Sequence, residues 1–275
     1  MAPPRFIFTI TAGRTGSDWL GKFLKVNLGI HTVHEPLGIA DMGTEMPDTR
    51  QLRSFNDLGW TREIDAFWHG KLGRIGAREG YAETNHVLSK AGLIEALSQW
   101  AGAPETAVIC LRRDPAAQIL SYLERSDFTN IAGIWQWFLD LRYRNVILDP
   151  APFKPFGALG HATWYALEMR AREAYYRQLF GDTLRFVQVD LEAVTTSDGA
   201  AGLLASLDRD TPAPILPEKA NSNPPSANRE TARAEVASFV DRVSFDADAL
   251  ARAYIASGRR LDAPLGTDFA AATAG

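Results

Sequence analysis

The chain has 275 residues, of which 46% are hydrophobic, so it is long enough for one large α/β domain with a small helical annex. The formal net charge is −4 and the longest basic clusters are pairs, Arg112 with Arg113 and Arg259 with Arg260, which argues against a nucleic-acid-binding protein. The single cysteine, Cys110, excludes an intrachain disulfide and lies in an apolar run, which favours a buried core thiol. Because we find neither a signal-peptide pattern nor a run of about 18 apolar residues, we expect a cytoplasmic protein without a membrane span.

Short extended runs alternate with helical patterns along most of the chain. We expect strands or extended runs at residues 6–11, 30–34, 81–84, 107–111 and 184–189. Between and after them we expect helices at 91–101, 115–125, 131–146 and 160–180, and one that includes 19–28. Residues 12–16 are expected to form a turn, and 38–78 loops with short helices. Strands that alternate with helices predict the α/β class, with a central parallel sheet flanked by helices. Such sheets bind ligands beyond the C-terminal ends of their strands, so the turns after the strands are the places to search for a site.

The last third of the chain contains a segment that breaks regular structure. Residues 211–228 are rich in proline and asparagine, and we interpret 210–228 as a loop or lid that leads to C-terminal helices at 229–257. We detect no internal repeat and treat residues 1–275 as a single domain.

The segment after the first strand has the character of an anion-binding loop. Residues 11–20 read TAGRTGSDWL and lead from a strand into a helix, whose first N–H groups and dipole favour an anion. Two glycines let the backbone approach a ligand, two hydroxyl side chains can donate hydrogen bonds, and Arg14 adds a planar guanidinium that suits phosphate or sulfate oxygens. It is not the loop of ATP-binding proteins, because only two residues separate Gly13 from Gly16 and no lysine follows. An ordinary strand–turn–helix with Ser17 as N-cap is the alternative.

The same residues resemble the 5′-phosphosulfate loop of sulfotransferases that use 3′-phosphoadenosine 5′-phosphosulfate (PAPS), with the approximate pattern Pro-(Lys/Arg)-Ser-Gly-(Thr/Ser)-Thr-Trp-Leu. The resemblance implies a P-loop sulfotransferase fold with helical insertions, and it implies that the donor is bound by Arg14, Thr15, Gly16, Ser17, Asp18 and Trp19. Cytosolic members carry lysine where this chain has Arg14, whereas carbohydrate and protein-tyrosine members often carry arginine. Asp18 replaces a usual threonine or serine but keeps its backbone N–H. Trp19 falls at the adenine-stacking position, or packs its helix on the sheet.

A second segment supports the same resemblance. Residues 109–122 read ICLRRDPAAQILSY and resemble the family's 3′-phosphate motif, in which a strand ends in Arg-(Asn/Asp)-Pro and a serine follows eight positions after the arginine. Arg113 and Ser121 have this spacing. The family usually adds a basic contact from the C-terminal loop, for which Lys219 and Arg229 are candidates.

Two residues compete as the base that would take a proton from the acceptor. Glu35 follows the second extended run, where carbohydrate and protein-tyrosine sulfotransferases often place a carboxylate. His86 follows the third strand, where cytosolic members place a histidine in the order Lys-Thr-His; here Asn85 or His86 occupies that slot. With Arg14 in the donor loop we favour Glu35. The spacing of His31, His34 and Glu35 is too loose to indicate a metal site, and we expect no metal.

Aromatic residues are frequent in the two segments expected to form the acceptor pocket, 38–78 and 128–165. They are Trp60, Phe67, Trp68, Trp135, Trp137 and Trp164. Aromatic side chains suit a sugar face or an apolar small molecule, and core packing explains most of them equally well.

Together these features predict a sulfotransferase that moves a sulfuryl group from PAPS to a hydroxyl of a small molecule or carbohydrate, and releases 3′-phosphoadenosine 5′-phosphate (PAP). Arg14 would stabilise charge on the leaving phosphate. The alternatives are a P-loop nucleotide kinase or NTPase, which the missing lysine disfavours, and a nucleotide-binding module without catalysis.

Overall fold

The computed structural model describes residues 2–36, 46–47, 49–129, 137–209, 213–218 and 227–264. The strands are β1 Phe6–Ile10, β2 His31–His34, β3 Tyr81–Thr84, β4 Thr106–Arg112 and β5 Arg185–Asp190. The helices are α1 Ser17–Leu28, α2 Thr49–Leu58, α3 Arg62–Gly76, η1 Leu88–Lys90, α4 Leu93–Gln99, η2 Ala103–Glu105, α5 Pro115–Glu124, η4 Ala151–Phe156, α6 Gly157–Phe180, α7 Leu191–Val194, α8 Ser197–Ser206, α9 Ala227–Asp241 and α10 Ala247–Ala256.

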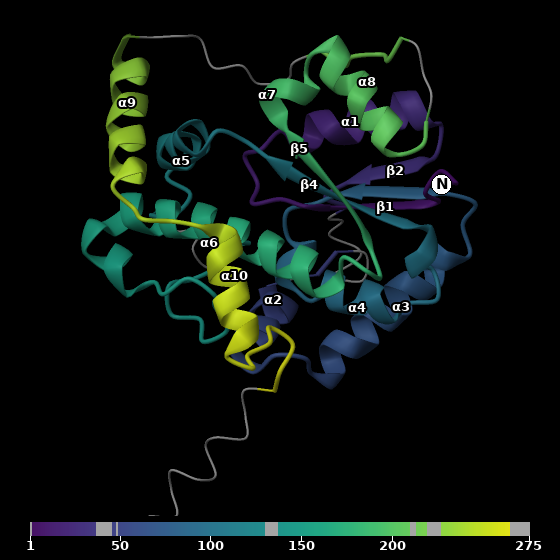
Figure 1. The fold of residues 1–275 in the computed structure, drawn as a ribbon, viewed down its shortest axis with the longest axis horizontal. Coiled ribbons are helices and arrows are strands. Elements are labelled where there is room, and N and C mark those ends of the chain that lie inside the picture. Colours follow the sequence, from purple (N-terminus) through teal and green to yellow (C-terminus); the bar gives the residue numbers. More distant parts are fainter. Residues whose placement is uncertain are drawn as a thin grey trace, which may run out of the picture.

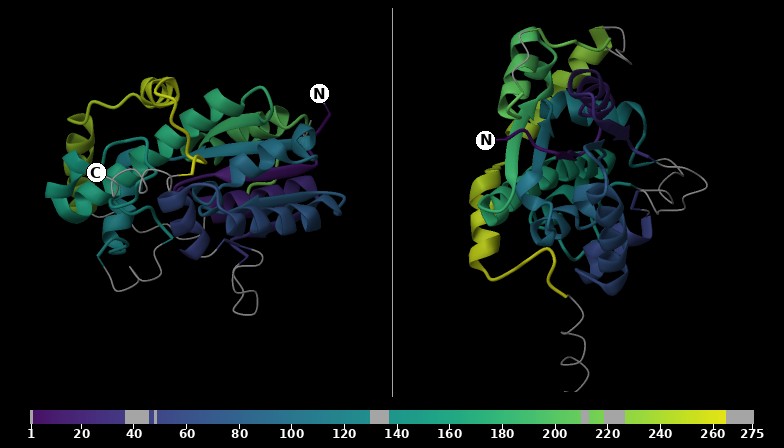
Figure 2. Two further views of the ribbon diagram at one scale, coloured as in Figure 1. Left: turned by 90° about the horizontal axis from the view of Figure 1, so that it is seen from below. Right: turned by 90° about the vertical axis from the view of Figure 1, so that its right-hand side faces the viewer.

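The strands form one five-stranded parallel sheet in the order β2-β3-β1-β4-β5. Helices cover both faces, with α1 and α8 on one and α3, α4, α6 and α10 on the other (Figures 1 and 2). The α/β class with a central parallel sheet is therefore confirmed. In this order β2 and β3 lie on one side of β1, and β4 and β5 lie on the other. Such a reversal of strand order predicts a crevice beyond the C-terminal end of β1.

Alternating side chains of the strands supply the two halves of the core. Phe6 and Phe8 of β1 point into the larger cluster around α6, while Ile7 points into the cluster formed with α1 and α8. Cys110 of β4 is fully buried in the larger cluster, as expected for a core thiol. Burial raises the pKa of its thiol well above the usual value, so it stays protonated and unreactive.

The expected helix at 131–146 is wrong in its described part. Residues 137–146 form turns, because their N–H groups bond to partners outside a helix: the Asp140 side chain accepts from Arg142 N at 2.9 Å, and Asn145 N donates to Asn56 O at 2.9 Å. Residues 130–136 lie outside the described ranges. The region 38–78 is more helical than expected, since α3 alone has 15 residues.

The described part of the expected lid, residues 213–218, is irregular and bonds to α1. The side chain of Asn27 donates to Ile215 O at 2.8 Å and accepts from Ile215 N at 2.8 Å. The expected C-terminal helices are present as α9 and α10. None of the helices in the described ranges is long and apolar enough to cross a lipid bilayer.

One buried carboxyl makes the stability of the fold depend on pH. Glu95 of α4 is 1% exposed, and this burial raises its pKa to about 8. The folded chain therefore holds a proton here at pH values where the unfolded chain, with a pKa near ~4.3, has lost it. Stability consequently falls as pH rises between these two values, by up to about 1.4 kcal/mol per pH unit.

We expect Glu95→Gln to remove this dependence, because the amide cannot ionise. The difference in free energy of unfolding between variant and wild type should grow in the variant's favour by about 3 kcal/mol between about pH 5.5 and about pH 7.5. Urea unfolding at the two pH values measures it. A difference that does not change with pH would mean that Glu95 ionises normally in the folded chain.

Candidate active site

The loop between β1 and α1 has the backbone of an anion cradle. Gly13, Arg14 and Gly16 have φ values of 79°, 57° and 82°, in the left-handed region. Left-handed residues in a turn can direct successive N–H groups toward one side of the loop. The residue before α1 is Gly16, which offers no side-chain cap, and Ser17 is already helical. The alternative with Ser17 as N-cap is therefore wrong, and the first N–H groups of α1 remain available for an anion.

The two glycines allow neighbouring segments to press against the loop. A Cβ on Gly16 would lie 2.5 Å from Cδ1 of Leu191, which follows β5, and one on Gly13 would lie 3.2 Å from Cγ of His86, which follows β3. Both residues are left-handed as well, so larger side chains would be strained. The loop thus lies in contact with the segments after two other strands.

Buried side chains donate hydrogen bonds to the loop carbonyls from the core. The Tyr122 hydroxyl donates to Ala12 O at 2.8 Å, the Tyr165 hydroxyl donates to the same carbonyl at 2.7 Å, and Gln118 Nε2 donates to Gly13 O at 2.9 Å. Because these carbonyls are bonded toward the core, the loop is already shaped before any ligand arrives.

The two sequence motifs meet at this loop. Arg14 Nε donates to Ser121 Oγ of α5 at 3.0 Å, and Arg113 Nη1 donates to Arg14 O at 2.9 Å. Arg113 Nε is buried without a hydrogen-bond partner among the described residues. Burial, and the repulsion between these arginines and their basic neighbours, lower the pKa of both guanidinium groups, which remain charged. Two desolvated cations beside an open set of N–H groups favour a bound anion.

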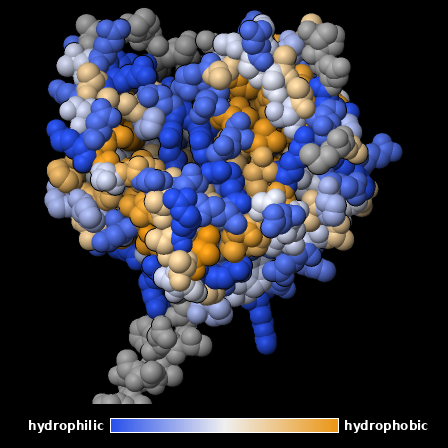
Figure 3. Space-filling view, viewed as in Figure 1, coloured by the Kyte–Doolittle hydropathy of each residue, from blue (hydrophilic) through white to orange (hydrophobic). Residues whose placement is uncertain are grey.

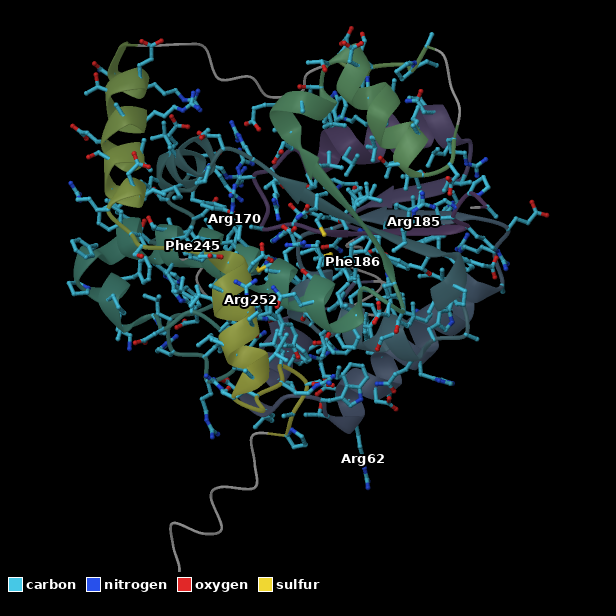
Figure 4. All side chains as sticks on the ribbon, viewed as in Figure 1. Arg62, Arg170, Arg185, Phe186, Phe245 and Arg252 are labelled. Carbon is cyan, nitrogen blue, oxygen red and sulfur yellow. The ribbon has the colours of Figure 1, made fainter. Side chains whose placement is uncertain are left out.

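Further basic side chains approach from other helices. Arg229 and Arg233 of α9, which packs on α5, add positive potential at Arg113, although each also pairs with a carboxylate. Arg170 of α6 donates to Arg113 O at 2.8 Å and points toward the strand ends (Figure 4). Hydrophilic side chains gather on the surface between α9 and α7 (Figure 3). Lys219 lies outside the described residues.

The remaining residues of the expected donor loop differ in their exposure. Thr15 is 1% exposed, and its hydroxyl is bonded to that of Thr11. Ser17 is also buried, whereas Asp18 is at the surface and pairs with Lys22 at 2.7 Å. The Asp18 side chain is thus engaged within α1, and its backbone N–H is what the loop can offer to a ligand.

Trp19 is part of the core between α1 and α8. Its ring stacks on Phe23 with centroids 5.3 Å apart, and its Nε1 donates to Pro217 O at 3.1 Å. Trp19 therefore packs its helix on the sheet, which is the second of the two roles expected for it. A contact with a nucleotide stays a prediction.

Glu35 lies just beyond β2 in a constrained conformation. Its φ is 42°, rare for a residue with a side chain, and its N–H donates to Thr84 O at 3.2 Å. Its carboxylate oxygens lie 3.8 Å from His86 Nε2 and 3.9 Å from His34 Nε2. His34 Nδ1 is in turn 2.8 Å from Thr84 O. A partly exposed carboxylate that lies between two histidines suits a proton acceptor.

Of the two residues that competed for the histidine slot, only His86 faces Glu35. Asn85 is fully buried; its Nδ2 donates to Glu83 Oε1 at 3.2 Å and its Oδ1 accepts from Val87 N at 2.9 Å. Asn85 therefore has a structural role at the end of β3 and sets the direction of His86.

Sequence reasoning missed Lys90, which lies behind His86. It is fully buried, and its Nζ is 3.0 Å from His86 Nδ1 and 2.8 Å from the Tyr165 hydroxyl. Burial lowers the pKa of Lys90, and the Glu35 carboxylate opposes that shift. The signal in the sequence was the interval of four residues, which is about one helical turn, between His86 and Lys90.

Most of the aromatic residues expected near an acceptor are core residues. Trp68 and Trp164 are buried, with Nε1 donating to Ala91 O and Leu148 O. Trp60, Phe67 and Trp137 are partly buried against the core, and Trp135 lies outside the described residues. Beside the site, the partly exposed ring of Phe138 lies 5.5 Å from that of His86 and 5.1 Å from that of Phe128.

The potential metal ligands do not converge. In the described ranges no three His, Cys, Asp or Glu side chains are placed to hold a metal ion. His31 instead stacks on Tyr81 with ring centroids 5.8 Å apart.

No family model and no curated protein matches this sequence. Among solved structures, the chain is similar to a crystal structure of a sulfotransferase from Alicyclobacillus acidocaldarius, with 16% identity, a TM-score of 0.48, and coverage of 93% of this chain and 97% of the other.

Proposed function

We propose that the protein is a sulfotransferase that uses PAPS as donor and a hydroxyl of a small molecule or carbohydrate as acceptor. The observation that carries the proposal is the meeting of Arg14, Ser121 and Arg113 at an uncapped helix N-terminus, on a loop bonded into the core. Both segments were identified by their resemblance to the two phosphate-binding motifs of that family, and they lie about a hundred residues apart in the chain.

The residues present fit such a donor. The loop N–H groups and Arg14 would hold its 5′-phosphosulfate end, while Arg113 and Ser121 would hold the 3′-phosphate, with Arg233 and Arg229 adding positive potential. PAPS supplies an activated sulfuryl group. Arg14 would stabilise the negative charge left on the phosphate oxygen, and Glu35 would accept the proton of the acceptor hydroxyl.

The first test separates this proposal from a kinase or NTPase. PAP at about 100 times its Kd should add about 2.7 kcal/mol to the free energy of unfolding, and thermal melting can measure this. Mg-ATP should stabilise the protein little, because the loop has Arg14 but lacks the lysine of ATP-binding loops. Stabilisation by Mg-ATP and not by PAP would refute a PAPS-dependent enzyme.

A further inference from the structure

A buried lysine lies behind His86, one of the two candidate bases. Lys90, at the end of η1, is fully buried, and its Nζ contacts His86 Nδ1, the Tyr165 hydroxyl oxygen and Trp137 O. An ammonium group has three N–H donors and no acceptor. The surroundings of Lys90 thus provide one partner for each of its possible protons.

The hydrogen-bond directions at two of these contacts are determined by the partners. Tyr165 donates its own proton to Ala12 O at 2.7 Å, so its oxygen accepts from Lys90. The Trp137 carbonyl can only accept. Only the third contact, with His86 Nδ1, depends on whether Lys90 is an ammonium or a neutral amine.

The Nε2 atom of His86, which faces Glu35, distinguishes the ammonium of Lys90 from the neutral amine. An ammonium at Lys90 donates to Nδ1 and leaves the imidazole proton on Nε2, which is 3.8 Å from Glu35 Oε1. A neutral amine would accept a hydrogen bond from Nδ1–H. The unprotonated Nε2 would then face the Glu35 carboxylate, and because both are acceptors this contact is unfavourable. The ammonium state gives an attractive contact at every position.

Burial lowers the pKa of Lys90, but the Glu35 carboxylate and the aromatic rings beside the ammonium favour its charged form. The rings of Phe138 and Tyr165 lie 5.4 Å and 5.1 Å from Lys90 Nζ, a distance at which aromatic faces stabilise a cation. Burial and the neighbouring cation lower the pKa of His86 well below its usual value. The titratable and charged groups that act on this pair are His34, Glu35, Tyr165 and Arg172.

We propose that Lys90 is a positioning residue that holds His86 as the neutral Nε2–H tautomer, so that His86 donates toward Glu35 and orients that carboxylate. The step from Glu35 to catalysis rests on the proposed sulfuryl transfer, whereas the tautomer does not. In this arrangement neither nitrogen of His86 is free to take a proton from an acceptor, because Nε2 carries one and Nδ1 is bonded to Lys90. Of the two candidates, Glu35 is left as the base.

The tautomer can be measured without any donor or acceptor. In the full-length protein labelled with ¹⁵N-histidine, long-range proton–nitrogen correlation should show His86 Nδ1 unprotonated and Nε2 protonated at neutral pH. The signal is identified by its absence in His86→Gln. A protonated Nδ1, in either the other tautomer or the imidazolium, would overturn the proposal. Because the tautomer is read from the wild-type protein, it holds even if Lys90→Met fails to fold.

Removing the cation should release His86. In Lys90→Met we expect both tautomers of His86 and a higher pKa of its imidazole, because one of the cations that lower that pKa is gone. If PAPS is the donor, kcat should fall by roughly tenfold to a hundredfold with KM for PAPS unchanged, because only the orientation of Glu35 is lost. Lys154→Met, on an exposed lysine of η4, is the matched control and should behave as wild type. An unchanged His86 tautomer in Lys90→Met would contradict the proposal, whether or not turnover is found.

Discussion

Glu35→Gln should reduce turnover by about 10²- to 10⁴-fold while leaving the binding of PAP unchanged. The amide has the same shape as the carboxylate and keeps the left-handed backbone of residue 35, where φ is 42°, but it cannot accept a proton at neutral pH. The carboxylate lies beyond β2, between His34 and His86, and has no contact with Arg14 or Arg113 among the described residues. Binding of the donor product therefore should not depend on it.

The measurement is the release of PAP from PAPS in the presence of a panel of phenols, sugars and aliphatic alcohols, with PAP binding followed by calorimetry. Glu79→Gln, on an exposed glutamate before β3, is the matched control. Near-normal turnover in Glu35→Gln would exclude Glu35 as the base. No turnover by the wild-type protein with tight PAP binding would instead favour the binding module without catalysis.

Arg113→Met should weaken PAP binding by roughly tenfold to a hundredfold, the range expected when one hydrogen bond to a charged group is lost. Arg113 leaves the end of β4 and lies beside Arg14 and Ser121, and its Nε has no partner within the described chain. Adenosine 5′-monophosphate lacks the 3′-phosphate, so its affinity should be the same for variant and wild type.

Titration calorimetry with the two nucleotides measures this difference. Arg62→Met is the control, because Arg62 is exposed and projects from α3 away from the strand ends (Figure 4). Equal weakening of both nucleotides would assign Arg113 to holding the loop through Arg14 O, not to the 3′-phosphate. Unchanged binding of PAP would remove Arg113 from the site.

The fold class and the meeting of the two motifs could be predicted from the sequence because both depend on local patterns. The apolar runs of β1 and β4 and the helices after them are encoded by residues next to one another in the chain. The turns after these strands contain Arg14 and Arg113, and in a parallel sheet such turns lie along one edge. Arg14 and Arg113 meet because β1 and β4 are neighbouring strands in the sheet.

The error in the expected helix at 131–146 also has a physical cause. Residues 137–146 contain a helix-compatible pattern, but their N–H groups bond to Asn56 and to side chains such as Asp140. Tertiary contacts of this kind override a weak helical preference. Trp19 matched a motif position, and its ring packs against Phe23 on the helix face that covers the sheet, so its contact with a nucleotide stays a prediction.

By itself, the sequence determined a parallel α/β protein with a loop that contains glycine and arginine after its first strand and a second arginine after its fourth. The surroundings of Glu35 were decided only by the tertiary structure. Strand order β2-β3-β1-β4-β5 brings the ends of β2 and β3 together, so that Glu35 meets His86. The packing of α6 then places Tyr165 beside Lys90. This packing, which no local pattern encodes, holds the Lys90 ammonium against Nδ1 of His86, where we propose that it sets the tautomer.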